Sequence, residues 1–181
     1  NVYRALGKKP ALVVFALDVA KGLVPALIVR TLFTPDWGLL VGLTAVAGHS
    51  LSPFIGFRGG QGISTGLGAM LGSQPAVALG ALGTFLVVFG ITSFVSLASI
   101  VAAASAVVFS MLFSGSVMSV LMFVGLLVLV VVRHRANIQR LREGTEPRFT
   151  FQSTADEAPE PAAPSSDEVE APEADGGTSE P

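Results

Sequence analysis

The chain has 181 residues, of which 51% are hydrophobic and only 13% are charged. Because soluble domains usually carry about 25% charged residues, this composition excludes an ordinary soluble domain and indicates a membrane protein. The absence of cysteine excludes disulfides, thiolate catalysis and cysteine-ligated metals. The net charge of −2 conceals an asymmetry, because residues 1–151 hold all 11 basic side chains but only 4 of the 13 acidic ones. Residues 1–151 therefore carry a net charge of +7, which suits contact with anionic lipids and anionic substrates.

Six apolar segments follow a short polar start and predict transmembrane helices. They cover residues 11–33, 38–56, 63–72, 76–91, 97–113 and 117–132. The third has only ten residues and would reach about 15 Å as a helix, so we expect neighbouring helices to shield it. The sequence therefore predicts an all-α, polytopic membrane helix bundle, with about six transmembrane helices in one domain at residues 1–151.

The basic residues predict how the bundle is oriented. Cytoplasmic loops carry an excess of Lys and Arg, and five arginines follow the last apolar segment: Arg133, Arg135, Arg140, Arg142 and Arg148. Counting back through the spans places Arg58 and Arg4 on the same side, whereas the opposite loops contain no Lys or Arg. We therefore expect a multi-pass protein of the inner (plasma) membrane.

Residues 152–181 differ from the rest of the chain. They hold nine acidic residues, five prolines and no aromatic or basic residue. Such a segment cannot bury enough apolar surface to fold, so we expect a disordered, acidic, Pro- and Ala-rich cytoplasmic tail.

A glycine-rich stretch follows the second predicted span. Gly59, Gly60 and Gly62 come directly after Arg58. Backbone N–H groups can close on an anion where no Cβ intervenes, the next helix offers its N-terminus to negative charge, and Arg58 can add a two-pronged contact. Close helix packing is the alternative use of such glycines. The stretch thus favours either a phosphate site or tight packing.

Polar side chains also occur inside the predicted spans. Asp18 and Lys21 are three residues apart on one helix face and can pair, with substrate contact as the alternative role for Lys21. Each charge in a span costs about 2.5–3.5 kcal/mol on insertion. His49 is either structural or catalytic. Ser96 either bonds back to its own helix or reaches a bound phosphate.

His134 and Asn137 follow the last span and share one face if the helix continues. A topology anchor requires arginines such as Arg133 but neither an imidazole nor an amide. Arg4, the glycine stretch, Ser96 and this segment all map to one end of the bundle. That convergence predicts a polar, cationic cavity for a substrate that carries phosphate. No metal-binding spacing is present, so we expect neither a metal nor a cofactor.

These motifs, in this order and spacing, resemble those of the bacterial membrane acyl-phosphate:glycerol-3-phosphate acyltransferase (PlsY) family. Residues 1–4 match the end of the family's first motif, residues 18–22 the helix after it, residues 48–62 the second motif and residues 133–146 the third. Gln61 stands where the family usually has Lys. The front of the first motif and the span that carries it are absent from this sequence, and the resemblance implies seven spans in the full-length family.

The resemblance implies transfer of an acyl group from acyl phosphate to the 1-hydroxyl of sn-glycerol 3-phosphate, which gives lysophosphatidate and inorganic phosphate. This reaction is the first acylation of phospholipid biosynthesis. Catalytic roles are implied for His134, Asn137 and Ser96. Substrate or phosphate binding is implied for Arg4, Lys21, His49, Arg58, Gly59, Gly60, Gly62 and Arg133. Glu146 is expected to be structural.

The expected partners are acyl phosphate, glycerol 3-phosphate and the bilayer, with a functional link to a soluble acyl-phosphate-forming enzyme. We expect a monomer and no nucleic-acid partner. Two other functions compete with catalysis: a small organic-phosphate transporter, and a catalytically degenerate subunit descended from the enzyme. Because the front of the first motif is absent, the 181-residue chain itself is expected to turn over at background rate.

Overall fold

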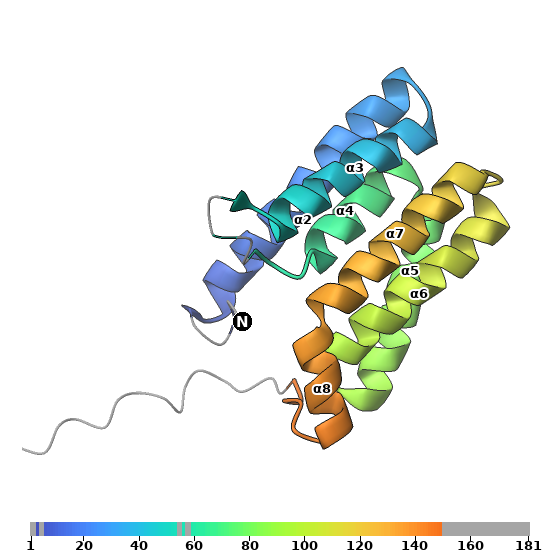
Figure 1. The fold of residues 1–181 in the computed structure, drawn as a ribbon. Coiled ribbons are helices and arrows are strands. Elements are labelled where there is room, and N and C mark those ends of the chain that lie inside the picture. Colours follow the sequence, from blue (N-terminus) through green and yellow to red (C-terminus); the bar gives the residue numbers. More distant parts are fainter. Residues whose placement is uncertain (1–2, 4–5, 54–55, 57–58, 150–181) are drawn as a thin grey trace, which may run out of the picture. The chain divides into compact units, whose positions relative to one another are not determined.

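The structure is a computed structural model that describes residues 3, 6–53, 56 and 59–149 (Figure 1). Seven bounded helices lie within these residues: α2 (Lys8–Leu32), α3 (Pro35–Ser50), α4 (Ile63–Ser73), α5 (Pro75–Thr92), α6 (Val95–Phe113), α7 (Val117–Arg133) and α8 (Arg135–Glu143). No strand occurs among them, so the described chain is all-α as predicted. Arg4, Arg58 and the predicted tail lie outside the described residues, and the division into a membrane domain and a tail stays a prediction.

The helices coincide with the predicted apolar segments, with two differences. The helix predicted at residues 38–56 ends at Ser50, because Pro53 disfavours helical backbone at the residue before it. The last helix does not continue beyond Arg133, and α8 leaves it at 60°. Proline explains two starts as well. Pro35 and Pro75 occupy the first turns of α3 and α5, where a missing N–H removes no helical hydrogen bond.

Among the described helices, α2, α5 and α6 are long and apolar enough to cross a membrane, and the bent pair α7 and α8 makes a fourth if it counts as one span. Helix α3, with 16 residues, and α4, with 11, are shorter. The protein is therefore an integral, multi-pass membrane protein, while the predicted count of six spans remains a prediction.

Helices α2, α3 and α4 pack with unusually close backbones. A Cβ on Gly22 of α2 would lie 2.8 Å from Ala69 N of α4, and one on Gly68 of α4 would lie 2.9 Å from Leu23 N of α2. Side chains at these glycines would force the helices apart. Glycine at such contacts is typical of helix pairs in membranes, where close van der Waals packing replaces the hydrophobic effect between helices.

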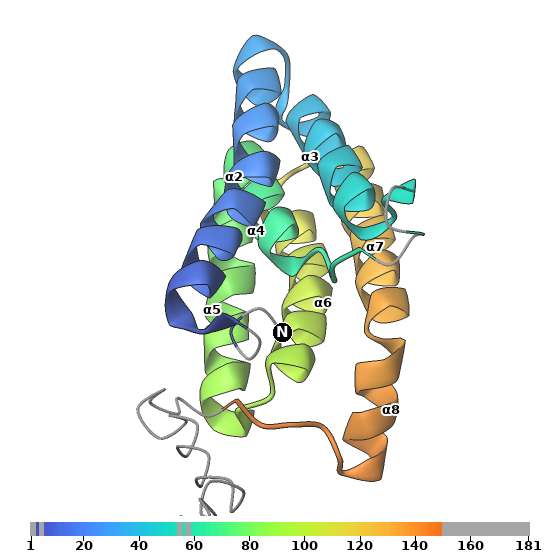
Figure 2. The ribbon, with the colours of Figure 1, turned by 90° about the vertical axis from the view of Figure 1, so that its left-hand side faces the viewer.

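The apolar core lies where the three-helix group meets α5, α6 and α7, which Figures 1 and 2 show beside it. Leu39 and Phe123 are fully buried there. Other large apolar side chains point outward, such as Ile91 and Val117, which are 80% and 76% exposed. Outward-facing apolar surface on helices whose backbone is satisfied internally is the pattern expected in lipid.

Hydrogen bonds tie three turns together at one end of the bundle. Asp36 at the start of α3 accepts from Ser116 at 2.6 Å and from Ser119, and Ser119 in turn accepts from Gln74 between α4 and α5. The turns between α2 and α3, α4 and α5, and α6 and α7 therefore meet at this end. The residues of the candidate site gather at the other end.

Candidate active site

The glycine-rich loop lies directly against His49 at the end of α3. A Cβ on Gly60 would lie 2.7 Å from His49 Cε1, and a Cβ on Gly59 would lie 2.9 Å from Ser50 O. Gly62 has a φ of +79°, in the left-handed region, and caps the N-terminus of α4. Close approach and backbone conformation therefore require glycine at all three positions, independently of any ligand. Gly59 and Gly60 therefore pack closely against His49, and close packing is the alternative role that the sequence suggested for these glycines.

Helix α2 contacts the same histidine. Lys21 Nζ lies 2.5 Å from Asp18 Oδ1 and 2.6 Å from His49 Nδ1. The pairing of Asp18 with Lys21 at a spacing of three residues is thus confirmed. The extension of that pair to His49, on another helix, could not be read from spacing within one helix.

Arg133, at the end of α7, reaches the loop from the other side. Its Nη2 atom donates a hydrogen bond to the backbone carbonyl of Gly59. The guanidinium predicted to bind substrate therefore also fastens the glycine loop to α7. A cation held in this way remains close to the backbone of the loop.

His134 sits at the bend between α7 and α8. His134 and Asn137 do not share the face of one continuous helix, the arrangement considered from sequence, because the backbone of His134 has φ −97° and ψ 9° and α8 leaves α7 at 60°. The side chain is fully buried, and Nδ1 lies 2.8 Å from Val130 O. Because a carbonyl only accepts, Nδ1 carries the hydrogen. The Nε2 atom has no hydrogen-bond partner among the described residues.

The amide of Asn137 is held between two side chains. Gln61 Nε2 donates to Asn137 Oδ1 at 2.8 Å, and Asn137 Nδ2 donates to Glu146 Oε1 at 2.8 Å. These two bonds fix which end of the amide faces which partner. They also link the glycine loop to α8 and to the segment that follows it.

Glu146 is the centre of this cluster. Its Oε1 also accepts from Ser96 at 2.6 Å, and its Oε2 accepts from Arg140 Nε at 2.8 Å. Burial acts to raise the pKa of Glu146, but hydrogen bonds from Asn137, Ser96 and Arg140 outweigh it, so the pKa lies below its usual range. The carboxylate is therefore charged at neutral pH.

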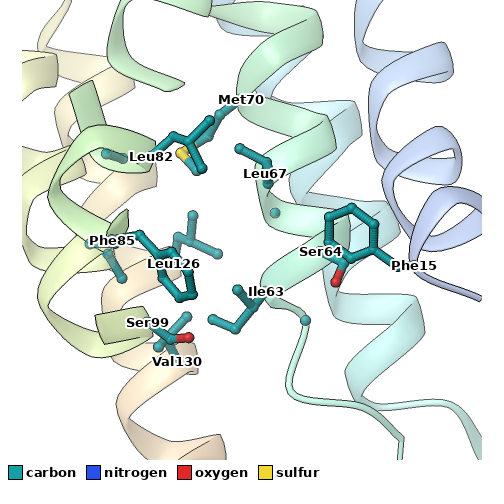
Figure 3. A pocket seen from close by; sticks show the side chains of 15 residues that line it. Phe15, Ile63, Ser64, Leu67, Met70, Leu82, Phe85, Ser99, Leu126 and Val130 are labelled. Atoms are coloured by element: carbon teal, nitrogen blue, oxygen red, sulfur yellow. The ribbon is translucent and has the colours of Figure 1, made fainter. Parts of the chain in front are cut away.

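An apolar cavity of about 150 Å³ begins beside this polar cluster (Figure 3). Gly62, Ser99 and Val130 line its polar-cluster end, and Met70 and Leu82 line it further along α4 and α5. Figure 3 shows the side chains of Met70, Leu82 and Ser99 facing the space between α4 on one side and α5, α6 and α7 on the other. The lining is almost entirely apolar, so the cavity suits an apolar group.

The structure brings together most of the residues predicted from sequence. His49, Lys21, Gly59, Gly60 and Arg133 form one connected group. Ser96 and Asn137 meet at Glu146 in a second group, and Gln61 joins the two through the loop. Arg4 and Arg58 lie outside the described residues.

Sequence reasoning gave Gln61 and Glu146 no place in the site. Glu146 could have been noticed as an acidic residue within a basic segment. No group of three acidic or histidine side chains in the described part of the chain could hold a metal ion.

Comparison with known proteins shows which family the chain resembles. The family model for glycerol-3-phosphate acyltransferase matches residues 1–144. A glycerol-3-phosphate acyltransferase of Geobacter sulfurreducens is 45% identical over 150 residues, which cover 82% of this chain and 77% of that protein. One of Synechococcus sp. (strain CC9902) is 44% identical over 150 residues, covering 82% of this chain and 75% of its own length.

Two solved structures are similar as well. Both are crystal structures of PlsY (YgiH), an integral membrane glycerol 3-phosphate acyltransferase. The glycerol 3-phosphate form has a TM-score of 0.79 and 41% identity, and covers 83% of this chain and 79% of that one. The lysophosphatidic acid form has a TM-score of 0.78 and 42% identity, and covers 83% and 78%. The chain therefore belongs to the glycerol-3-phosphate acyltransferase family.

Proposed function

We propose that this protein transfers an acyl group from acyl phosphate to the 1-hydroxyl of sn-glycerol 3-phosphate. The observation that carries the proposal is that the apolar cavity shares residues with the loop and the helix that hold the polar cluster. Gly62 ends the glycine loop and lines the cavity, and Val130 lines the cavity while its carbonyl binds His134. A substrate with a phosphate and an acyl chain can occupy both at once. The two PlsY structures, named for glycerol 3-phosphate and lysophosphatidic acid, support these ligands here.

The reaction needs little from the protein beyond placement and charge. The hydroxyl oxygen of glycerol 3-phosphate attacks the acyl carbonyl carbon, and the bond between that carbon and the phosphate oxygen breaks. The electron pair leaves on inorganic phosphate, which also carries away the hydroxyl proton. Because an acyl phosphate is already activated, holding the two substrates together and stabilising the developing oxyanion supply most of the rate.

The described side chains suit these tasks. In a neutral ring, His134 Nε2 is an acceptor, so it can orient the attacking hydroxyl, which must donate. Asn137 Nδ2 has two N–H groups, of which Glu146 takes one, and we assign the other to the oxyanion. The N–H groups of the glycine loop and Arg133 are assigned to phosphate.

The setting of the reaction follows from the same reasoning. We place the protein in the inner (plasma) membrane with the site and the acidic tail facing the cytoplasm, because the arginines follow α7 at the end where the site lies. Acyl phosphate would come from a soluble enzyme that forms it, and the protein would act as a monomer. The cavity would take the acyl chain.

The test is acyl transfer in liposomes by the purified protein, with the front of the first motif completed as the family has it. We expect lysophosphatidate and inorganic phosphate to form in equal amounts, and only when both acyl phosphate and glycerol 3-phosphate are present. Phosphate release without glycerol 3-phosphate would identify a hydrolase instead. Uptake of labelled glycerol 3-phosphate into the liposomes without acylation would identify the transporter considered above.

A further inference from the structure

The ion pair on α2 is connected to the glycine loop through a single ring, that of His49. Asp18 Oδ1 and His49 Nδ1 lie 2.5 Å and 2.6 Å from the same Lys21 ammonium. An ammonium only donates, so His49 Nδ1 accepts, and the hydrogen of the neutral ring is on Nε2. The pair thereby selects one tautomer and one orientation of the ring.

The oriented ring edge is the surface on which the loop rests. A Cβ on Gly60 would lie 2.7 Å from His49 Cε1, so the backbone of Gly60 is already in contact with the ring. Rotation of the ring would therefore move the loop. On its other side the loop is fixed by the hydrogen bond from Arg133 to the carbonyl of Gly59. The loop is held between α3 and α7.

Charged residues in an apolar helix are costly and usually mark function. Asp18 and Lys21 lie within α2, one of the helices long and apolar enough to span the membrane. Among the described residues, their side-chain hydrogen bonds and ion pairs reach only each other and His49. The residue on which this pair acts is therefore His49.

We propose that Asp18, Lys21 and His49 are positioning residues that set the glycine loop for its phosphate, rather than ligands of the substrate. Lys21 holds His49, and His49 holds Gly60. The proposal rests on the proposed function for the identity of the phosphate, that of glycerol 3-phosphate. It replaces the direct substrate contacts that the resemblance implies for Lys21 and His49.

A double-mutant cycle tests whether Lys21 acts through His49. We expect Lys21→Met to raise KM for glycerol 3-phosphate about 10-fold while kcat changes less, since the loop is displaced and the reacting groups are not. In a His49→Ala background, Lys21→Met should have no further effect. A Lys21→Met effect that persists there would overturn the proposal and make Lys21 a direct ligand. Lys9→Met, an exposed change on the same helix, is the matched control.

Gly60→Ala tests the contact between ring and loop. In the otherwise unchanged protein the added methyl meets the ring, so KM for glycerol 3-phosphate should rise. In the His49→Ala background the ring is gone, and Gly60→Ala should cost much less than it does alone. An equal cost in both backgrounds would overturn the role of His49 as the support of the loop.

A third measurement requires no activity and separates this proposal from the proposed function. The chain has no cysteine, so Gln61→Cys provides a single thiol next to the loop glycines. Adding Lys21→Met should speed its labelling by a water-soluble maleimide several-fold, whereas adding Lys9→Met should not. An unchanged labelling rate overturns the positioning role even if acyl transfer is observed. Faster labelling without acyl transfer supports positioning and refutes only the reaction.

Discussion

Asn137 Nδ2 lies 2.8 Å from Glu146 Oε1, so a carboxylate nine residues further along the chain fixes the amide proposed to meet the oxyanion. The same oxygen accepts from Ser96, and the second oxygen accepts from Arg140. The carboxylate therefore joins the start of α6 to both α8 and the segment after it. Experiments can separate what Glu146 contributes to the stability of the fold from what it contributes to the orientation of Asn137.

Replacement of Glu146 should affect stability before it affects chemistry. Glu146→Ala leaves Ser96 and Asn137 without this partner at a site where the acidic side chain is only 5% exposed, whereas Arg140, 41% exposed, can turn to water. Each unpaired buried group costs about 1–3 kcal/mol, so Tm in detergent should fall clearly. Glu146→Gln keeps one acceptor oxygen and should fall less. An Ala variant as stable as the wild type would contradict the role of Glu146 as the centre of the cluster.

The same residue predicts a pH dependence. Its folded-state pKa is lowered, so its stabilising contribution is complete above the unfolded pKa, about 4.3, and is lost as pH falls through the folded value. The Tm difference between wild type and Glu146→Gln should therefore be largest near neutral pH and shrink below about pH 4.3. Other carboxylates are common to both proteins and cancel in the comparison. A difference independent of pH would contradict the lowered pKa.

Removal of the proposed catalytic side chains should leave insertion intact and reduce turnover. Asn137→Ala and His134→Gln are each expected to lose about 10²-fold in kcat/KM, the scale of losing one transition-state contact. Arg135→Gln, an exposed change between the two, is the matched control and should stay near wild type. Steady-state phosphate release with both substrates measures all three. Wild-type turnover in both site variants would reduce this segment to a topology anchor.

The features of this site that the sequence could predict are those set within one helix or one segment of the chain. Apolar run length predicted the helices to within a few residues at most ends. Spacing within one helix predicted the pairing of Asp18 with Lys21. Contacts between helices depend on how each helix is rotated, which one sequence does not specify. The sequence therefore could not predict the hydrogen bond from Gln61 to Asn137, 76 residues away, or the contact of Lys21 with His49.

The bend at His134 escaped prediction for a different reason. The segment after α7 keeps a helical pattern, and no proline or glycine interrupts it. The change from apolar to strongly polar composition marks the place, but it does not give the angle of 60° between α7 and α8. The apolar cavity was missed as well, because its lining comes from five helices.

Gln61→Lys tests the departure from the usual family motif. Lysine can still donate to Asn137 Oδ1, as Gln61 Nε2 does at 2.8 Å, and it adds a positive charge beside the loop. We expect activity to be held or improved, with a lower KM for glycerol 3-phosphate. Gln61→Met, similar in length but without a donor, should lower kcat because Asn137 loses a partner. A Lys variant that behaves like the Met variant would show that this position has adapted to the amide.

Gly66→Leu tests the apolar cavity as the acyl-chain site. Gly66 lines the cavity, and a Cβ there would meet only Leu126 Cδ1, at 3.9 Å, so the added side chain can extend into the space. The variant should fold, and kcat/KM should fall more for long-chain acyl phosphates than for short-chain ones, because only long chains compete with the leucine. Gly83→Leu is the matched control, since Gly83 is exposed on α5 and has open space around it. The measurement is kcat/KM of both variants with acyl phosphates of several chain lengths. Equal losses for short and long donors would place the acyl chain elsewhere.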